Sequence, residues 1–348
     1  LRSGDLKGAC QENPKTLRVI EEIKAGDVPK EALTKGTCCR IMTGAPIPEG
    51  ADSVIMVEDT EADSREEVRI FKETKCGENI RRAGEDIREG DLAIEKGTVI
   101  RPAEVGMLAA LGRKVVRVVK RPKVAFLTTG IELVDIEEEV GPAKIRNSNG
   151  YALYALVLKY GGIPQILPTA RDNRNEIRQK IEQVIKADML LICGGVSVGK
   201  YDLVREAMEG LGVEMKFYKV AIKPGKPLAF GVIDKTPIFG LPGNPVSSII
   251  SFEIFVKEAL LAMSGRNDIR TTEVKAFIEE EIKKKPGRRH YLLARIKSKN
   301  GRYYACLSGP QGSGILSSLI KANGLIIINE EVTMIEPGSE VLVRLLDW

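Results

Sequence analysis

The sequence predicts a multidomain α/β protein, in which a central α/β sandwich domain lies between an N-terminal mostly-β module and a small C-terminal β barrel. Its 348 residues are enough for several domains with separate cores. Residues 122–268 alternate apolar strand-like runs with helix-like segments, which is typical of an α/β domain. Residues 269–348 return to short β-type runs separated by turns.

The N-terminal region divides into two predicted segments. Residues 1–80 form the mostly-β module, with short β-type runs at 53–57 and 68–71 between Gly, Pro and acidic turns. Residues 81–121 form a linking segment with a helix over 102–111, because Pro102 occupies the position that favours proline in a first helical turn.

The central domain, residues 122–268, carries repeated strand–helix units. Strands are expected at 123–127, 165–167 and 188–192, and helices from an Asn149 cap to Tyr160 and over 173–186, 203–210 and 245–263. Such units predict a parallel sheet with helices on both faces, whose ligands bind outside the carboxyl ends of the strands. Residues 128–132, 194–202 and 240–247 should therefore surround one crevice.

The C-terminal domain, residues 269–348, is predicted to be all-β. Its β-type runs fall at 274–278, 302–307, 324–328 and 340–345, with turn signals at Pro286-Gly, Asn300-Gly and Pro337-Gly. A small barrel or sandwich is the expected architecture.

Charge and composition exclude several classes of function. The net charge is only +5 and aromatic residues make up 5%, so neither a basic face nor a stacking surface for nucleic acid is expected. Residues 245–263 carry Glu253, Lys257 and Glu258, which indicates a core helix and no membrane span. A local basic pocket for an anionic small molecule fits this composition better.

Histidine and cysteine usage narrows the chemistry further. His290 is the only histidine, which nearly excludes Ser–His or Cys–His catalysis and a multi-histidine metal site. The six cysteines lack C-x-x-C spacing, so they read as free thiols of a reducing cytoplasm. Catalysis must therefore use carboxylates, Lys, Arg, Ser or Thr and backbone donors.

The run GGVSVG at 194–199 follows a predicted buried strand and precedes a helix. Glycines there let backbone N–H groups approach a phosphate, and the candidate ligand contacts are Gly194, Gly195, Ser197 and Gly199. An ordinary glycine turn explains the run equally well. Asp202 is either the cap of the next helix or a carboxylate that binds metal and substrate.

Lysines crowd a turn that prolines constrain. Lys219, Lys223 and Lys226 lie in the segment YKVAIKPGKP at 218–227, where little ordering is needed to hold an anion. A flexible, solvated run of charges is the alternative reading. The constraint favours an oxyanion site.

Polar residues also follow other strands. The segment LPGNPVSS at 241–248 places Asn244 and Ser247 at a helix start that suits anions. Glu132 and Asp172 each follow a strand and could join Asp202 around Mg²⁺, which prefers oxygen ligands. Solvated loop acids are the alternative.

Taken in order, these segments resemble the molybdopterin molybdenumtransferase family, which includes bacterial and archaeal MoeA and the E domain of gephyrin. The matching runs are RIMTGAPIPEGADSV at 40–54, NIRRAGEDI at 79–87, GGVSVG at 194–199 with Asp202, AIKPGKP at 221–227, LPGNPVS at 241–247, QGSG at 311–314 and ANG at 322–324. Each run alone is weak, but their order and spacing are specific.

The resemblance implies a central domain of molybdopterin-binding type in an elongated homodimer. It implies that the substrates are adenylylated molybdopterin and molybdate, or tungstate in its place, and that AMP is released with Mg²⁺. Contacts with other enzymes of cofactor biosynthesis are a further expectation. The family's catalytic positions match Thr43, Arg81, Asp86, Asp202 and Lys219, its metal positions match Glu132, Asp172 and Asp202, and its molybdate positions match Lys223, Lys226 and Ser313.

Three positions depart from the family pattern. Ile131 and Asn147 stand where the family usually has Asp, and Leu293 stands where it usually has Arg, with Arg295 as the nearest replacement. The chain begins at Leu1 and lacks the family's Asp-Gly-Tyr-Ala segment, so a fragment is expected. The alternative function is a non-catalytic molybdopterin-binding or scaffolding paralogue.

Overall fold

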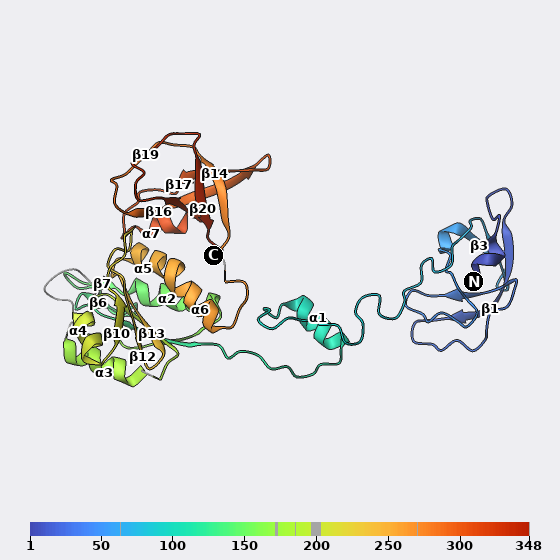
Figure 1. The fold of residues 1–348 in the computed structure, drawn as a ribbon, viewed down its shortest axis with the longest axis horizontal. Helices are drawn as coiled ribbons and strands as arrows, with labels where there is room; N and C mark the ends of the chain where they lie inside the picture. Colours follow the sequence, from blue (N-terminus) through green and yellow to red (C-terminus); the bar gives the residue numbers. More distant parts are fainter. Residues whose placement is uncertain (63, 171–172, 185, 196–202, 270, 348) are drawn as a thin grey trace. The chain divides into compact units, whose positions relative to one another are not determined.

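The computed structural model describes residues 1–348 except 63, 171–172, 185, 196–202, 270 and 348 (Figure 1). The chain divides into two compact units, Leu1–Ala93 and Ile94–Trp348. The division falls inside the predicted segment 81–121, so the finer boundaries of that region stay predictions.

The first unit contains a four-stranded sheet in the order β2 (Thr37–Ile41), β1 (Lys15–Ile23), β4 (Glu67–Ile70) and β3 (Thr60–Ala62). Strands β1 and β2 run parallel, and the other neighbours run antiparallel. Two 3₁₀ turns, η1 (Ser3–Leu6) and η2 (Val57–Asp59), accompany the sheet. Leu6, Leu17 and Ile70 form its core.

The strand predicted at 53–57 is wrong. The Val54 N–H donates to the Glu78 carbonyl at 3.0 Å, and Asn79 Nδ2 donates to the Val54 carbonyl at 2.9 Å. A loop, and no neighbouring strand, thus takes the hydrogen bonds of this apolar run.

In the second unit, α1 (Pro102–Ala110) confirms the predicted helix near 102–111. Pro102 is its first residue, and the Arg101 N–H donates to Glu104 Oε2 at 2.8 Å. No residue of α1 is buried, and Val105 and Leu111 are exposed.

The α/β domain has a six-stranded sheet. Its order is β10 (Glu214–Phe217), β12 (Ala229–Ile233), β13 (Thr236–Leu241), β9 (Met189–Cys193), β5 (Lys123–Thr128) and β8 (Ile163–Ile166). The last four run parallel, which confirms the predicted parallel sheet for these strands, but β12 is antiparallel to both of its neighbours. Asp234 and Lys235 have φ of 46° and 77°, the paired left-handed geometry of a two-residue hairpin turn, and such a turn joins only antiparallel strands.

Helices cover both faces of this sheet. One face carries α3 (Arg174–Val184) and α4 (Leu203–Gly210). The other carries α2 (Ser148–Lys159) and a long helix in three parts, α5 (Pro245–Ser251), a π turn η3 (Phe252–Val256) and α6 (Lys257–Met263). Figure 1 shows α2, α5 and α6 between the sheet and the C-terminal strands, and they share one apolar core with Tyr291, Leu293 and Leu325. No helix in the described part of the chain is long and apolar enough to cross a membrane.

The C-terminal domain is a closed five-stranded barrel. Strands β16 (Arg289–Lys299), β17 (Arg302–Leu307), β14 (Glu273–Ile278), β20 (Glu340–Leu345) and β18 (Gly324–Ile328) pair in this order, and β18 returns to β16. Four of these strands were predicted, and β16 was not. Shorter elements are α7 (Leu316–Ile320) and the pairs β15 (Ile282–Lys283) with β19 (Met334–Ile335) and β6 (Leu133–Val134) with β7 (Ile145–Arg146).

One strand of the α/β domain extends the barrel. Strand β11 (Ile222–Lys223) pairs parallel with the start of β16 and places Lys223 opposite His290. The Val246 N–H at the start of α5 also donates to the Ser313 carbonyl at 2.9 Å. These two contacts bring the predicted lysine turn against the barrel.

Candidate functional site

A crevice of about 800 Å³ lies at the carboxyl ends of β5, β9 and β13. We call it the strand-end crevice. Its lining residues are Thr128, Thr129, Gly130, Glu132, Leu133, Ile145, Arg146, Asn147, Ser148, Asn149, Cys193, Gly194, Gly195, Pro227, Pro242, Gly243, Asn244, Pro245, Gly314 and Leu316. The three strand ends meet there as the βαβ pattern predicts, and Gly314 and Leu316 add a contribution from the barrel domain.

The glycine turn at the end of β9 is packed tightly against β5. A Cβ on Gly194 would lie 2.4 Å from the Thr129 carbonyl, and one on Gly195 would lie 2.7 Å from Val204 Cγ2. Both glycines also have positive φ, 95° and 65°. Packing alone therefore requires glycine here. Ser197, Gly199 and Asp202 of the same motif lie outside the described residues, as does Asp172.

Two buried polar atoms of crevice residues have no hydrogen-bond partner in the described part of the chain. They are Thr129 Oγ1 and Asn149 Oδ1. The Asn149 Nδ2 donates to the Gly243 carbonyl at 2.7 Å and lies 3.2 Å from Cys193 Sγ, so Asn149 joins the start of α2 to the β13–α5 turn. The sequence analysis gave neither residue a ligand role. The available signals were that Thr129 directly follows β5 and that Asn149 lies two residues after Asn147.

Asn147, and not Asn149, caps α2. The Asn147 Oδ1 accepts from the Gly150 N–H at 3.0 Å, and its Nδ2 donates to Thr128 Oγ1 at 2.9 Å. The predicted Asn149 cap is wrong, because the helix begins one residue earlier, at Ser148. Asn147 is buried, and its amide joins the end of β5 to the first turn of α2 through these two hydrogen bonds. The departure from Asp at this position thus has a structural role.

Glu132 is the one predicted metal ligand in the described part of the chain. It lines the crevice, and a Cβ on Gly130 would lie 2.7 Å from its Oε2, so glycine leaves room for the carboxylate. No group of three His, Cys, Asp or Glu residues among those described could hold a metal ion. Ile131 is 65% exposed and does not line the crevice.

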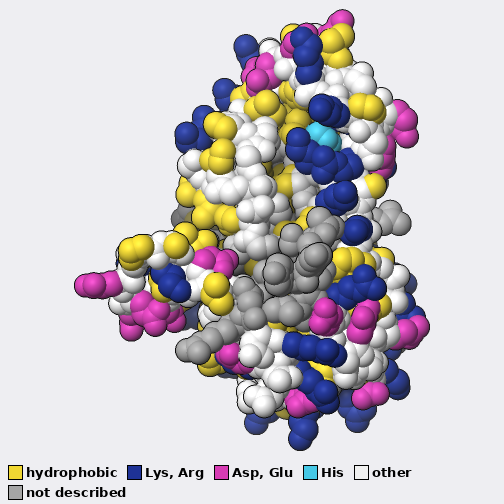
Figure 2. Space-filling view, turned by 90° about the vertical axis from the view of Figure 1, so that its left-hand side faces the viewer, with side chains coloured by type: hydrophobic (Ala, Val, Ile, Leu, Met, Phe, Trp, Pro, Cys, Tyr) yellow, Lys and Arg dark blue, Asp and Glu magenta, His cyan; other side chains and the backbone are white. Residues whose placement is uncertain are grey.

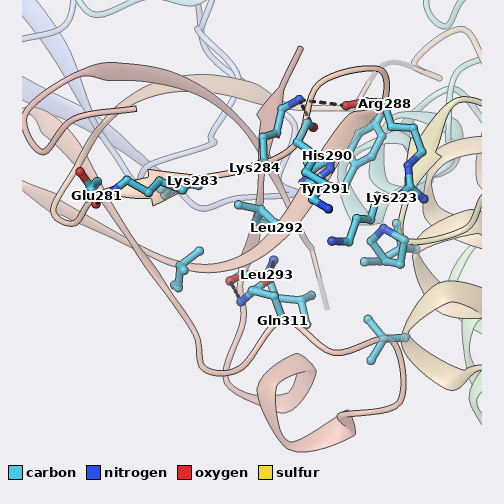
Figure 3. Close-up of a pocket in the computed structure, with 16 residues that line it drawn as sticks. Lys223, Glu281, Lys283, Lys284, Arg288, His290, Tyr291, Leu292, Leu293 and Gln311 are labelled. Carbon is cyan, nitrogen blue, oxygen red and sulfur yellow. Dashed lines mark hydrogen bonds and ion pairs between the residues drawn. The ribbon is translucent and has the colours of Figure 1, made fainter. Parts of the chain in front are cut away.

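A second pocket, of about 610 Å³, lies between β11, α5 and the barrel (Figure 3). We call it the basic cleft. Its lining residues are Lys223, Pro224, Val246, Ile250, Glu281, Ile282, Lys283, Lys284, Lys285, Arg288, His290, Tyr291, Leu292, Leu293, Leu307 and Gln311. Figure 2 shows Lys and Arg side chains gathered around the histidine on this face. Five of these residues are Lys or Arg and one is acidic, which favours an anionic ligand.

The cations of the basic cleft differ in their partners. Lys284 Nζ donates to the Arg288 and Glu330 carbonyls at 3.1 and 3.0 Å, so it holds the loop together. Lys283 pairs with Glu281 at 2.6 Å. Among the described residues, no carboxylate lies within ion-pair distance of Lys223, Lys285 or Arg288. Of these three cations, Lys223 and Arg288 are the two whose charges act on His290 in the cleft wall, and we take them as best placed to bind an added anion.

His290 is buried at the wall of this cleft, opposite Lys223. Burial, and then the positive charges of Lys223, Lys284 and Arg288, lower the pKa of His290 to about 4. Near neutral pH it is uncharged and can donate or accept a hydrogen bond without adding charge.

The other predicted ligand residues are dispersed around these pockets. Lys219 and Lys226 are exposed and line neither pocket, although Pro227 lines the crevice. Asn244 lines the crevice, whereas Ser247 is buried within α5. Ser313 is half-buried between Gln311 of the cleft and Gly314 of the crevice.

The departure at Leu293 is not offset by Arg295. The Leu293 side chain is buried in the core, and its backbone exchanges two hydrogen bonds with the Gln311 amide, at 2.8 and 3.1 Å. Arg295 does not line the cleft, and its Nε donates to the Lys321 carbonyl at 3.4 Å. The suggested replacement is therefore wrong.

Three predicted catalytic residues belong to the first unit. Thr43, Arg81 and Asp86 are all exposed there. Their catalytic roles stay predictions.

Comparison with known families gives matches along most of the chain. Residues 1–112 match the MoeA N-terminal region (domain I and II), residues 125–262 a probable molybdopterin binding domain, and residues 275–346 the MoeA C-terminal region (domain IV).

Individual relatives agree. A Bacillus subtilis protein named molybdopterin molybdenumtransferase is 33% identical over 350 residues, covering 99% of this chain and 81% of the relative. A Mycobacterium tuberculosis protein named molybdopterin molybdenumtransferase 2 is 34% identical, covering 99% and 85%. The crystal structure of the molybdopterin biosynthesis MoeA protein from Pyrococcus horikoshii OT3 matches with a TM-score of 0.81 at 34% identity, covering 99% of this chain and 85% of that one.

Proposed function

Because the chain belongs to the MoeA family, whose relatives are named molybdopterin molybdenumtransferases, we propose that it inserts molybdate into adenylylated molybdopterin and releases AMP. The observation that carries this proposal is the adjacency of two pockets. The strand-end crevice and the basic cleft share a wall, made by Pro245 and Val246 on one side and residues 311–314 on the other. The two pockets therefore lie next to each other, and molybdate would have to pass residues 311–314 to reach the pterin dithiolene.

In this proposal the crevice holds the pterin substrate. Its walls offer buried polar groups without partners among the described residues, Thr129 Oγ1 and Asn149 Oδ1, and buried polar groups are normally hydrogen-bonded. A heterocycle with alternating donors and acceptors meets that need. Gly194, Gly195 and Asn244 also line the crevice, and Ser197 and Gly199 belong to the same proposed contact set.

The basic cleft receives molybdate, or tungstate in its place. Lys223 and Arg288 would bind the oxyanion through charge-assisted hydrogen bonds, and neutral His290 adds a further polar contact. Lys219, Lys226 and Ser313 are proposed to complete the path toward the pterin. The surrounding lysines attract the dianion toward the cleft mouth.

Mg²⁺ is proposed to bind through Glu132, Asp172 and Asp202. The carboxylate of Glu132 in the crevice fits an oxygen-ligated ion. When bound, Mg²⁺ polarises the phosphoanhydride and offsets its charge. The protein's own contribution is to position the two substrates and stabilise developing negative charge.

A homodimer in the cytoplasm is the proposed working form. Several apolar side chains in and after α1 are exposed, at Val105, Leu111, Val115, Val118 and Val119, and a second copy would cover them. All six cysteines are free, which fits a reducing compartment. Sedimentation of a monomer at micromolar concentration would contradict the dimer.

A non-catalytic, molybdopterin-binding paralogue is the second candidate. Leu293 favours it, because a buried apolar residue stands where the family usually has Arg, and Arg295 does not line the cleft. The test is reconstitution: the chain, adenylylated molybdopterin, Mg²⁺ and molybdate should yield a cofactor that activates an apo-molybdoenzyme. Activation no greater than without the chain, together with tight pterin binding, would select the paralogue.

A further inference from the structure

A buried ionic cluster joins the α/β domain to the segment that follows β20. The Tyr160 hydroxyl lies 2.8 Å from Glu253 Oε1 and 2.7 Å from Asp347 Oδ1. Lys257 Nζ lies 3.4 Å from Glu253 Oε2 and 3.5 Å from Asp347 Oδ1. Tyr160, Glu253 and Lys257 are buried in the α/β domain, and Asp347 alone arrives from the barrel side. Lys159 Nζ also donates to the Asp347 carbonyl.

The Tyr160 hydroxyl cannot serve both carboxylates at once. Burial, and then the charge of Glu253, raise the pKa of Tyr160, so the hydroxyl keeps its single hydrogen. One hydrogen can donate to only one of the two oxygens that lie within reach. Asp347 therefore shares its donor with Glu253.

The three buried members of this cluster remain paired when Asp347 leaves. Tyr160 can donate to Glu253, and Lys257 stays beside Glu253, so no buried charge is abandoned. The Asp347 side chain is already 61% exposed and gains water on release. The contact is thus easier to break than an ordinary buried ion pair.

Among the described residues, this cluster is one of several attachments between the barrel and the α/β domain. They include the ion pair of Arg344 in β20 with Glu258 in α6, at 3.9 Å, and the apolar core that both domains share. Two further attachments lie at the walls of the basic cleft or crevice: the β11–β16 pairing, where the Arg289 N–H donates to the Ala221 carbonyl at 2.8 Å, and the bond from Val246 to Ser313. Leu346, next to Asp347, is packed into the core that the two domains share.

We propose that Asp347 is a positioning residue whose contacts with Tyr160 and Lys257 form a releasable latch between the barrel and the α/β domain. When the latch is closed, the barrel side of the basic cleft is held against Lys223. When it opens, the cleft widens and an oxyanion enters or leaves. The ligand's identity rests on the proposed function, whereas the latch itself does not.

Hydrogen exchange of the chain, without substrate, tests the latch. In Asp347→Ala, the amides of Arg289 and Val246 should exchange about ten-fold faster. Losing a hydrogen bond to a charged group shifts the equilibrium between the closed and open forms by roughly a factor of ten. In Asp347→Asn, which keeps an acceptor for Tyr160, the exchange rates of these amides should lie between those of the unchanged chain and those of Asp347→Ala. Glu340→Ala is the matched control, since this half-exposed carboxylate of β20 pairs with Lys275 inside the barrel.

Two results would overturn the latch. One is unchanged exchange at Arg289 and Val246 in Asp347→Ala. The other is equally faster exchange in the buried strand β9, which indicates general destabilisation. With molybdate as the probe, Asp347→Ala should raise the association and dissociation rate constants together; altered dissociation alone contradicts a gate. Absence of molybdate binding in every variant would count against the proposed function and leave the exchange result to decide the latch.

Discussion

The backbone N–H of Val246 donates to the carbonyl of Ser313 at 2.9 Å, across the wall that separates the strand-end crevice from the basic cleft. Val246 is the second residue of the long helix of the α/β domain, and Ser313 belongs to the barrel. Since both residues carry the bond through their backbones, the wall does not depend on a particular side chain at either position. This bond therefore helps to keep the two pockets side by side while the barrel is attached to the α/β domain.

Lys223→Ala should weaken molybdate binding by about ten-fold or more, because the lost charge-assisted hydrogen bond comes from a cation that has no carboxylate partner among the described residues. Lys283→Ala is the control, since Lys283 lines the same cleft but pairs with Glu281. Equilibrium dialysis with molybdate measures both. Equal losses in the two variants would mean that only the general charge of the cleft matters.

Gly194→Ala should destabilise the α/β domain by about 2–4 kcal/mol, from a positive φ combined with a collision against the Thr129 carbonyl. Gly212→Ala is the control, because Gly212 has φ of 79° and open space around its Cβ. It should cost only about 1 kcal/mol. Urea unfolding followed by circular dichroism gives the difference; a matching loss in both variants would refute the packing argument.

Asn147→Asp should not strengthen Mg²⁺ binding, although the family usually has Asp here. The change keeps the cap on the Gly150 N–H but removes the donor to Thr128 Oγ1, for an expected loss of about 1 kcal/mol. Calorimetric titration with Mg²⁺ tests the first point and thermal unfolding the second. A gain in Mg²⁺ affinity would contradict this prediction and indicate that position 147 belongs to the metal site.

The stability of the barrel should fall as the medium becomes acidic, through His290. Its pKa is lowered to about 4 in the folded chain, from an ordinary value of 6.5. Between these values the unfolded chain binds a proton that the folded chain does not, so the free energy of unfolding declines as pH falls from about 6.5 to about 4. The expected loss is about 1–3 kcal/mol, and His290→Gln should remove it. Urea titrations at several pH values measure this slope, and an identical slope in both proteins would contradict the assignment.

The strand-end crevice and the anion-binding role of Lys223 could be predicted from sequence, whereas the barrel side of the basic cleft could not. Apolar runs that end in Thr128, Cys193 and Leu241 mark strand ends, and parallel topology brings those ends together. The cleft depends on Lys223 lying opposite His290, two residues far apart in the chain. No local pattern predicts that pairing, because the basic residues at 288–290 lack the apolar pattern by which the start of β16 could be recognised.

The hairpin and the Tyr160–Asp347 contact escaped prediction for different reasons. Asp234 and Lys235 form the β12–β13 turn without a glycine, so the usual local signal was missing. Tyr160 and Asp347 meet only after the barrel closes and brings the segment beyond β20 back to α2, so their contact depends on tertiary structure.

Oxyanion-dependent release of AMP tests the proposed function most directly. The chain would be incubated with adenylylated molybdopterin and Mg²⁺, and AMP would be measured while molybdate and tungstate are titrated in parallel. We predict AMP release that rises and saturates with one of the two oxyanions and is lost in Asp202→Ala, with pterin binding retained. Tight pterin binding without AMP release at any oxyanion concentration would contradict the transferase and identify a binding protein.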